Sequence, residues 1–437
     1  MGHIGGVEQT YHLLQQRLDC NVTGAPDSPA FTRILKLLFS PEEGELARRI
    51  PSRPTSLGIL SRKLKIGQNE LCDRLTDMAQ RGLVLDLEHD GQRYFMLSPV
   101  AIGFFEFTFM RAREDLRMAE LAHLFHEYMD TKEDDRFARS VFQGQTQVGR
   151  SLVREEALSE EDHSEILDWE RASQVVRSAS AVGVSFCSCR HKASHLGKAC
   201  EAPQRSCLTF NFGAEALIRS GIAQPISTDE AMGILEKCKE AGLAQIGDNV
   251  QRKVTYICNC CGCCCGMVGA VKTFGIRNAI VTSNWIGEIS PSQCKGCGKC
   301  ARACPVEAIE MVKEGEGETK RQWAVCNQAL CLGCGVCYSV CKVGAMAMRP
   351  RAQRVFTPET VFDRIVSMAI ERGKLAHVLF QDPEKLSHRA LGRIVHALEK
   401  SPPFKAAMAV EPLRSAFLSA MVKGAKRSVG ELAQILG

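Results

Sequence analysis

The sequence predicts a multidomain α+β chain. Its 437 residues are too many for one ordinary domain. Apolar residues recur with helical spacing towards both ends, whereas most of the 22 cysteines crowd the middle. Hydrophobic residues make up 45% and charged residues 24% of the chain, which is typical of globular proteins and excludes a disordered or fibrous chain.

Residues 1–97 are the first predicted domain. Apolar spacing predicts helices at 31–39, 42–50, 56–64 and 69–81, followed by strands at about 83–88 and 93–97. Asp90 and Gly91 lie between the two strands and suit the positive φ angles of a tight hairpin turn. This succession of helices and a hairpin resembles a winged helix-turn-helix domain, which implies binding to DNA or docking to a protein.

The charges of the 69–81 helix favour docking or a structural role. Glu70, Asp73 and Asp77 outnumber Arg74 and Arg81, whereas an element that enters a DNA groove should be basic to neutralise phosphates. Nucleic acid is therefore not the expected partner. Basic residues elsewhere in the domain keep the DNA alternative open: Arg48, Arg49, Arg53, Arg62, Lys63 and Lys65.

Four more units follow. They are a helical connector (98–180), a cysteine-rich α/β region (181–285), a second cysteine module (286–350) and a helical C-terminal region (351–437). Alternating charges on amphipathic segments indicate the connector. Asp229 and Glu230 favour a helix at 228–241, because acidic side chains stabilise a first turn. Apolar stripes at 361–370 and 388–398 predict the C-terminal helices.

The N-terminus and the apolar runs bear on location. The chain begins without the pattern of a secretory signal, and no apolar run reaches the ~18 residues of a membrane helix. We therefore expect a cytoplasmic protein with no transmembrane segment. In a reducing compartment, 22 cysteines do not indicate a disulfide framework, so metal binding is the leading explanation.

Two cysteine runs in the 286–350 module have the spacing C-x2-C-x2-C-x3-C. The runs are Cys294, Cys297, Cys300 and Cys304, followed by Pro305, and Cys331, Cys334, Cys337 and Cys341. This pair of runs resembles bacterial-type ferredoxins with two 4Fe-4S clusters. Zinc is the rival metal, because CxxC pairs also form zinc ribbons. The matched quartets, the Cys-Pro step and the repeated sequence after each run favour iron-sulfur clusters.

The resemblance also implies how the cysteines are shared. In that family the fourth cysteine of each run binds the other cluster. The first cluster would then be held by Cys294, Cys297, Cys300 and Cys341, and the second by Cys331, Cys334, Cys337 and Cys304. Lys342 stands where the family usually has proline, and its positive charge is expected to raise the potential of the nearer cluster.

Ten further cysteines lie upstream and predict additional metal sites. They are Cys187, Cys189, Cys200, Cys207, Cys258, Cys260, Cys261, Cys263, Cys264 and Cys265. So many thiolates would repel one another unless a metal neutralised them. We expect one or two further iron-sulfur clusters. Consecutive side chains in extended backbone point in opposite directions, so some of these cysteines must serve a second site or none.

The upstream pattern carries weaker resemblances. Its CxC pair and cysteine-rich run before a ferredoxin module are similar to iron-sulfur proteins of anaerobes, which implies anaerobic metabolism. Cys260-Cys261-Gly262 resembles the CCG element of heterodisulfide reductase-type subunits, although the match is one tripeptide. His191 and His195 are interpreted as surface or supporting residues, with iron ligation or proton donation as the alternatives. Nearby Arg190 is expected either to neutralise thiolates, to receive an acidic partner or to be ordinary solvated charge.

These observations predict an iron-sulfur electron-transfer protein. It would relay single electrons between a low-potential donor and a partner oxidoreductase, as a subunit of a redox complex and not as a stand-alone catalyst, and no residue is assigned a catalytic role. The redox partner would be a flavoprotein or a catalytic subunit, because no G-x-G-x-x-G follows a predicted strand. Two alternatives are an iron-sulfur reductase whose upstream cluster binds substrate and a redox-sensing DNA-binding regulator.

Overall fold

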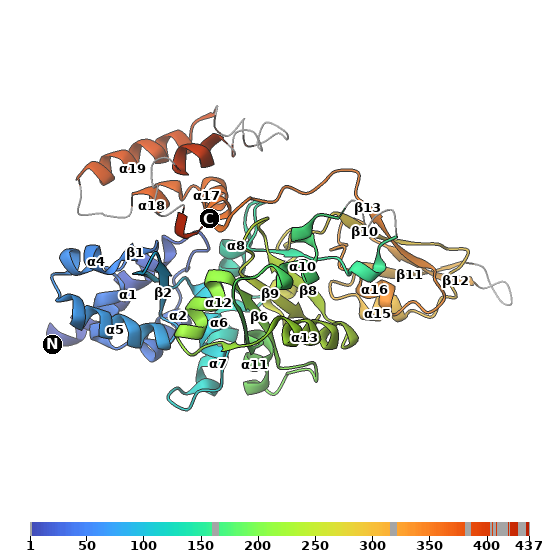
Figure 1. The fold of residues 1–437 in the computed structure, drawn as a ribbon, viewed down its shortest axis with the longest axis horizontal. Coiled ribbons are helices and arrows are strands. Elements are labelled where there is room, and N and C mark those ends of the chain that lie inside the picture. Colours follow the sequence, from blue (N-terminus) through green and yellow to red (C-terminus); the bar gives the residue numbers. More distant parts are fainter. Residues whose placement is uncertain are drawn as a thin grey trace.

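The computed structural model is elongated, with the N-terminal helices at one end and the 286–350 module at the other (Figure 1). It describes residues 2–159, 166–314, 321–380 and 386–402, together with 404, 408, 418, 420–426 and 434–436. A continuous apolar core runs through the N-terminal helices, the central sheet and the C-terminal helices, and includes Phe31, Phe104, Ile246 and Val366. These regions therefore stabilise one another by burying a shared apolar surface. Among the described residues, no helix is both long and apolar enough to cross a membrane.

The N-terminal elements appear where the sequence predicted them. The helices are α2 (Pro29–Leu38), α3 (Pro41–Ala47), α4 (Leu57–Leu64) and α5 (Gln68–Gln80), and the strands are β1 (Thr55–Ser56), β2 (Val84–His89) and β3 (Gln92–Leu97). Ser28 and Ser40 cap α2 and α3. The hairpin turn is confirmed, since Asp90 and Gly91 have φ angles of 50° and 71°. A further helix, α1 (Gly2–Asp19), was not predicted.

The expected helical connector is correct only in its first half. Helices α6 (Phe105–Phe109), α7 (Met118–Met129) and α8 (Arg136–Phe142) are followed by extended chain. This extended segment contributes β4 (Gly149–Ser151) to the central sheet and is followed by the short helix α10 (Ala172–Arg177). Strand β4 forms its backbone hydrogen bonds with β8, which is about 95 residues away in the sequence. The alternation of charges along the sequence does not predict such a pairing.

The cysteine-rich region contains a six-stranded antiparallel sheet in the order β4-β8-β9-β6-β5-β7. Its other strands are β5 (Val182–Phe186), β6 (Arg205–Phe210), β7 (Gln224–Pro225), β8 (Ala244–Asp248) and β9 (Tyr256–Cys260), and its helices are α11 (Ser188–His195), α12 (Asn211–Arg219), α13 (Thr228–Glu240) and α14 (Gly266–Phe274). The predicted 228–241 helix is confirmed as α13, which Ser227 and Glu230 start with a capping box.

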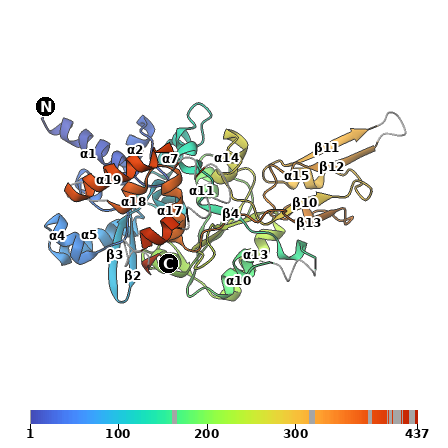
Figure 2. The ribbon, with the colours of Figure 1, turned by 90° about the horizontal axis from the view of Figure 1, so that it is seen from above.

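The 286–350 module consists of two similar halves. Strand β10 (Trp285–Ile289) pairs with β13 (Met346–Pro350), and β11 (Ile309–Glu314) pairs with β12 (Arg321–Cys326). The short helices α15 (Lys299–Ala303) and α16 (Val336–Ser339) lie beside one another. The hairpin of β11 and β12 points away from the body of the protein in Figure 2.

The C-terminal helices are α17 (Val361–Glu371), α18 (Leu375–Leu379) and α19 (Leu386–Glu399). They pack over the N-terminal domain (Figures 1 and 2). Arg372 donates hydrogen bonds to the carbonyls of Val22 and Val141, and Lys374 donates to those of Asp19 and Asn21. The apolar side chains of α17 are buried, so its apolar stripe is core.

Candidate metal centres

The two ferredoxin-type loops bend at glycines that no other residue could replace without strain. Gly296 and Gly333 have φ angles of 65° and 70°. A Cβ atom on Gly333 would lie 2.1 Å from the carbonyl oxygen of Trp285, and one on Gly296 would lie 2.5 Å from that of Gln322. The tight turns let the first three cysteines of each run bend towards one another.

The second set of cysteines lies around one small cavity. Cys331, Cys334 and Cys337 line it from their own run, and Cys304 reaches it from the first run. Cys326, which appeared isolated in the sequence, lines the same cavity from β12. The structure thus places Cys304 with the second run, as the exchange of fourth cysteines requires.

The first set is less buried than the second. Cys294, Cys300 and Cys341 pack against an apolar cluster that includes Ile309 and Met346 and that Cys304 and Cys337 also touch, and Cys297 is exposed. A cluster held by these residues would therefore approach the molecular surface.

Backbone amides in the module point at cysteine sulfurs, which suits bound iron-sulfide. The amides of Gly296 and Ala324 lie 3.4 and 3.5 Å from Cys294 Sγ, and that of Ala308 lies 3.2 Å from Cys304 Sγ. Burial raises the pKa of Cys334 to about 12, so this thiol would stay protonated at neutral pH without a metal. Four converging thiols with amide support fit 4Fe-4S clusters, which supply one-electron redox chemistry when bound.

The ten upstream cysteines separate into two groups. We call six of them the inner set, and four the outer quartet. The inner set is Cys187 and Cys189 at the start of α11, Cys207 on β6, Cys258 and Cys260 on β9, and Cys265 before α14. Cys258 and Cys260 are two positions apart on one strand and so face the same side of the sheet.

Neighbouring thiols of the inner set contact one another in a chain. Cys265 Sγ and Cys260 Sγ are 3.2 Å apart. Hydrogen bonds from Cys187 and Cys265 hold the pKa of Cys189 well below its usual range, and bonds from Cys207 and Cys260 do the same for Cys258. The fold therefore favours two thiolates within a row of six sulfurs, of which those of Cys260 and Cys265 are buried.

Arg190 supplies a buried positive charge beside these sulfurs. Its side chain is fully buried, so the interpretation of Arg190 as ordinary solvated charge is wrong. The guanidinium donates to the carbonyls of Asn259 and Pro203 and to Ser206 Oγ. Burial lowers the pKa of Arg190, but the charges of Cys187 and Cys261 outweigh this effect and raise it.

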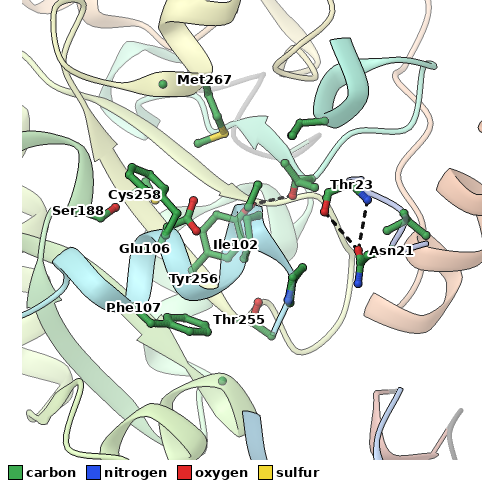
Figure 3. A pocket seen from close by; sticks show the side chains of 18 of the residues that line it. Asn21, Thr23, Ile102, Glu106, Phe107, Ser188, Thr255, Tyr256, Cys258 and Met267 are labelled. Atoms are coloured by element: carbon green, nitrogen blue, oxygen red, sulfur yellow. Dashed lines mark hydrogen bonds between the residues drawn. The ribbon is translucent and has the colours of Figure 1, made fainter. Parts of the chain in front are cut away.

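A cavity of about 320 Å³ adjoins the inner set, and all six of its cysteines line the wall. Figure 3 shows Glu106, Tyr256 and Cys258 at its centre and Asn21 and Thr23 towards one side. Burial raises the pKa of Glu106 to about 8. No pattern in the sequence indicated this cavity, because its walls come from loops and strands of the N-terminal domain, from helices α6 and α8, from the sheet and from α17.

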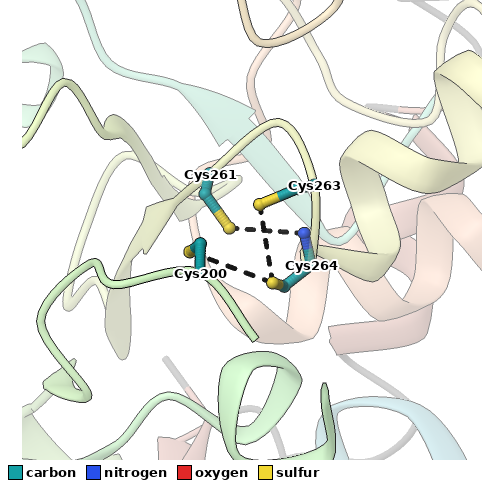
Figure 4. A group of neighbouring side chains, drawn as sticks. All are labelled: Cys200, Cys261, Cys263 and Cys264. Carbon is teal, nitrogen blue, oxygen red and sulfur yellow. Dashed lines mark hydrogen bonds between the residues drawn. The ribbon is translucent and has the colours of Figure 1, made fainter. Parts of the chain in front are cut away.

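The outer quartet is Cys200, Cys261, Cys263 and Cys264, and its four Sγ atoms lie within 4.8 Å of one another (Figure 4). Cys200 belongs to the loop after α11, and the other three surround a turn between β9 and α14. The expectation that consecutive cysteines serve different sites fits Cys264 and Cys265, which lie in the quartet and at the inner cavity respectively. Cys261 belongs to the quartet and also lines the inner cavity beside Cys260.

The two histidines interact with protein groups. His191 Nδ1 donates to the carbonyl of Phe109 at 2.8 Å, and the Nε2 atoms of His191 and His195 are 3.2 Å apart. His191 also lies edge-on to Phe186. These contacts fit the supporting role interpreted from the sequence.

The ferredoxin-type module touches the upstream cysteines directly. Gly262, inside the outer quartet's turn, approaches Pro305 so closely that a Cβ atom would lie 3.1 Å from the Pro305 carbonyl oxygen. Ala244 on β8 packs against Cys334 and is also the strand partner of Cys260. The amide of Arg154 donates to the Cys334 carbonyl at 3.2 Å. The second cysteine set and the inner set therefore share a packed boundary.

Comparison with known families identifies the module. A family model for a 4Fe-4S dicluster domain matches residues 293–345, well under half of the chain. No match was found among curated proteins or among solved structures. The match and the cysteine clusters support an iron-sulfur protein with a ferredoxin-type module, a class that generally transfers electrons.

Proposed function

We propose that this protein relays single electrons between a low-potential donor and a partner oxidoreductase, as a subunit of a redox complex. The observation that carries this proposal is the packed boundary formed by Gly262 and Pro305 and by Ala244 and Cys334. Electron transfer slows steeply with distance, so two centres on either side of such a boundary suit rapid exchange. The path would run from the exposed first cluster through the second cluster to the inner set.

The surface around the first cluster suggests the chemistry of one partner. Exposed Lys295, Lys299 and Arg302 surround exposed Cys297, and the stretch 294–302 contains no acidic residue. A redox partner with an acidic face would be attracted to this site, and association would weaken with added salt.

Widening the boundary is expected to slow electron flow without removing iron. In Gly262→Val, the new side chain must push against the Pro305 backbone. We expect reduction of the upstream centre to lag behind that of the ferredoxin clusters, measured by freeze-quench electron paramagnetic resonance after adding one electron per chain. Gly269→Val is the matched control, because a Cβ atom there meets nothing within 4 Å. Equal rates in the two variants would reject the proposed path.

A second candidate function is reduction of a small substrate at the inner set. The observation that favours it is the cavity of about 320 Å³, which is larger than the ~150 Å³ that holds benzene in an engineered core. Substrate-dependent oxidation of the pre-reduced, full-length chain, without any partner protein, would support this candidate over a simple relay.

For the winged-helix-like N-terminal domain we propose a docking or structural role. The basic side chains of its α5 segment are paired within the protein: Arg74 with Glu70, and Arg81 with Glu43 and Asp77. Paired arginines are poorly placed to neutralise phosphates. DNA binding that changes with the redox state would instead favour the regulator alternative.

A further inference from the structure

The outer quartet differs from the other cysteine groups in how closely its sulfurs converge. Cys263 Sγ lies 3.5 Å from Cys264 Sγ, which lies 3.9 Å from Cys200 Sγ. Four sulfurs at ~2.3 Å from one tetrahedral ion are about 3.8 Å apart. The spacing of the quartet is therefore that of thiolates around a single ion.

The ferredoxin-type cysteines provide an internal comparison. We compared groups of three or more potential metal ligands in the part of the chain that the structure describes. The outer quartet is the group whose ligand atoms all lie within 4.8 Å of one another. Neither run of the 4Fe-4S dicluster match does so, and nor does the inner set around its cavity. This difference is expected, since thiolates of a 4Fe-4S cluster bind four different irons and must stand farther apart.

The surroundings of the quartet also suit a closed single-ion site. The amide of Cys264 donates to Cys261 Sγ at 3.3 Å, across the turn at 262–264. Lys272 Nζ donates to the carbonyl of Gly262 at 3.2 Å and also pairs with Glu307 at 2.6 Å, so it ties this turn to the ferredoxin-type module. Four thiolates around a divalent ion carry a net charge of about −2, which amide hydrogen bonds and a nearby cation stabilise.

We propose that Cys200, Cys261, Cys263 and Cys264 bind one structural zinc ion and not an iron-sulfur cluster. The ion would join the loop that carries Cys200 to the turn between β9 and α14. It would thereby hold Gly262 against Pro305, and Cys260 and Cys265 towards the inner cavity. This inference is independent of the relay function, because a structural ion carries no electrons.

Metal analysis of the full-length chain after anaerobic purification tests the proposal. Wild type should contain about one zinc per chain, and Cys263→Ser should lose it while iron and acid-labile sulfide stay unchanged. Cys72→Ser is the control, since Cys72 lies in the N-terminal domain next to Arg93 and outside every cysteine group described above. Absorption at the zinc edge of wild type should show four sulfur neighbours at ~2.3 Å.

The outcomes separate the possibilities. Loss of about four irons and four sulfides in Cys263→Ser would overturn the single-ion site in favour of a cluster. If the zinc-edge spectrum shows nitrogen or oxygen neighbours, the zinc is adventitious and the four-cysteine site is wrong. Because the edge measurement uses wild type, the proposal stays testable even if the variant fails to fold.

Discussion

Replacing Cys304 by alanine should remove the second 4Fe-4S cluster and leave the first intact. Cys304 belongs to the first run in sequence but lies with Cys331, Cys334 and Cys337 in space. We therefore expect the loss of about four irons and four sulfides per chain, measured after anaerobic purification. The remaining electron paramagnetic resonance signal should match that of Cys334→Ala and differ from that of Cys300→Ala.

Two controls sharpen this expectation. Cys326→Ala alters a thiol in the same cavity without removing a proposed ligand, so it should retain all the iron. Cys341→Ala should leave the same residual signal as Cys300→Ala, that of the second cluster, because Cys341 is the proposed fourth ligand of the first cluster. If Cys304→Ala instead resembles Cys300→Ala, each run holds its own cluster and the exchange is wrong.

The features that the sequence predicted well depend on residues that lie close together along the chain. The cysteine runs, the capped helix α13 and the hairpin at Asp90 and Gly91 each have their determinants within about 15 residues, where pattern and propensity act directly. The 4Fe-4S dicluster match falls on the same module for the same reason.

The features that the sequence missed depend on contacts between distant residues. Strand β4 is set by pairing of Gly149 with Asp248, and the walls of the large cavity come from several domains. The division of the upstream cysteines needed the fold as well, because Cys200 joins the outer quartet while Cys207, on the next strand, joins the inner set. The positions of the cysteines in the sequence do not give the distances between them in the fold or the directions of their side chains.

Arg190→Met should empty the inner set and destabilise the protein. Arg190 is the fully buried cation that touches Asn259, Pro203 and Ser206, beside a row of six sulfurs. Methionine keeps much of the volume but removes the charge and leaves three acceptors without their donor. Removing one partner of a buried charged group costs ~3–5 kcal/mol, so unfolding in denaturant should need correspondingly less free energy.

Two further variants distinguish charge from packing. Arg205→Met removes an exposed arginine of β6, near the same cysteines, and should keep both iron and stability. Arg190→Lys restores the charge but cannot reach all three acceptors, so it should retain more upstream iron than Arg190→Met while remaining less stable than wild type. If Arg190→Met and Arg190→Lys lose iron equally, hydrogen bonding and not charge holds the inner set together. If Arg190→Met keeps its iron, the buried arginine does not stabilise a bound metal, because an uncompensated anionic cluster could not persist in that interior.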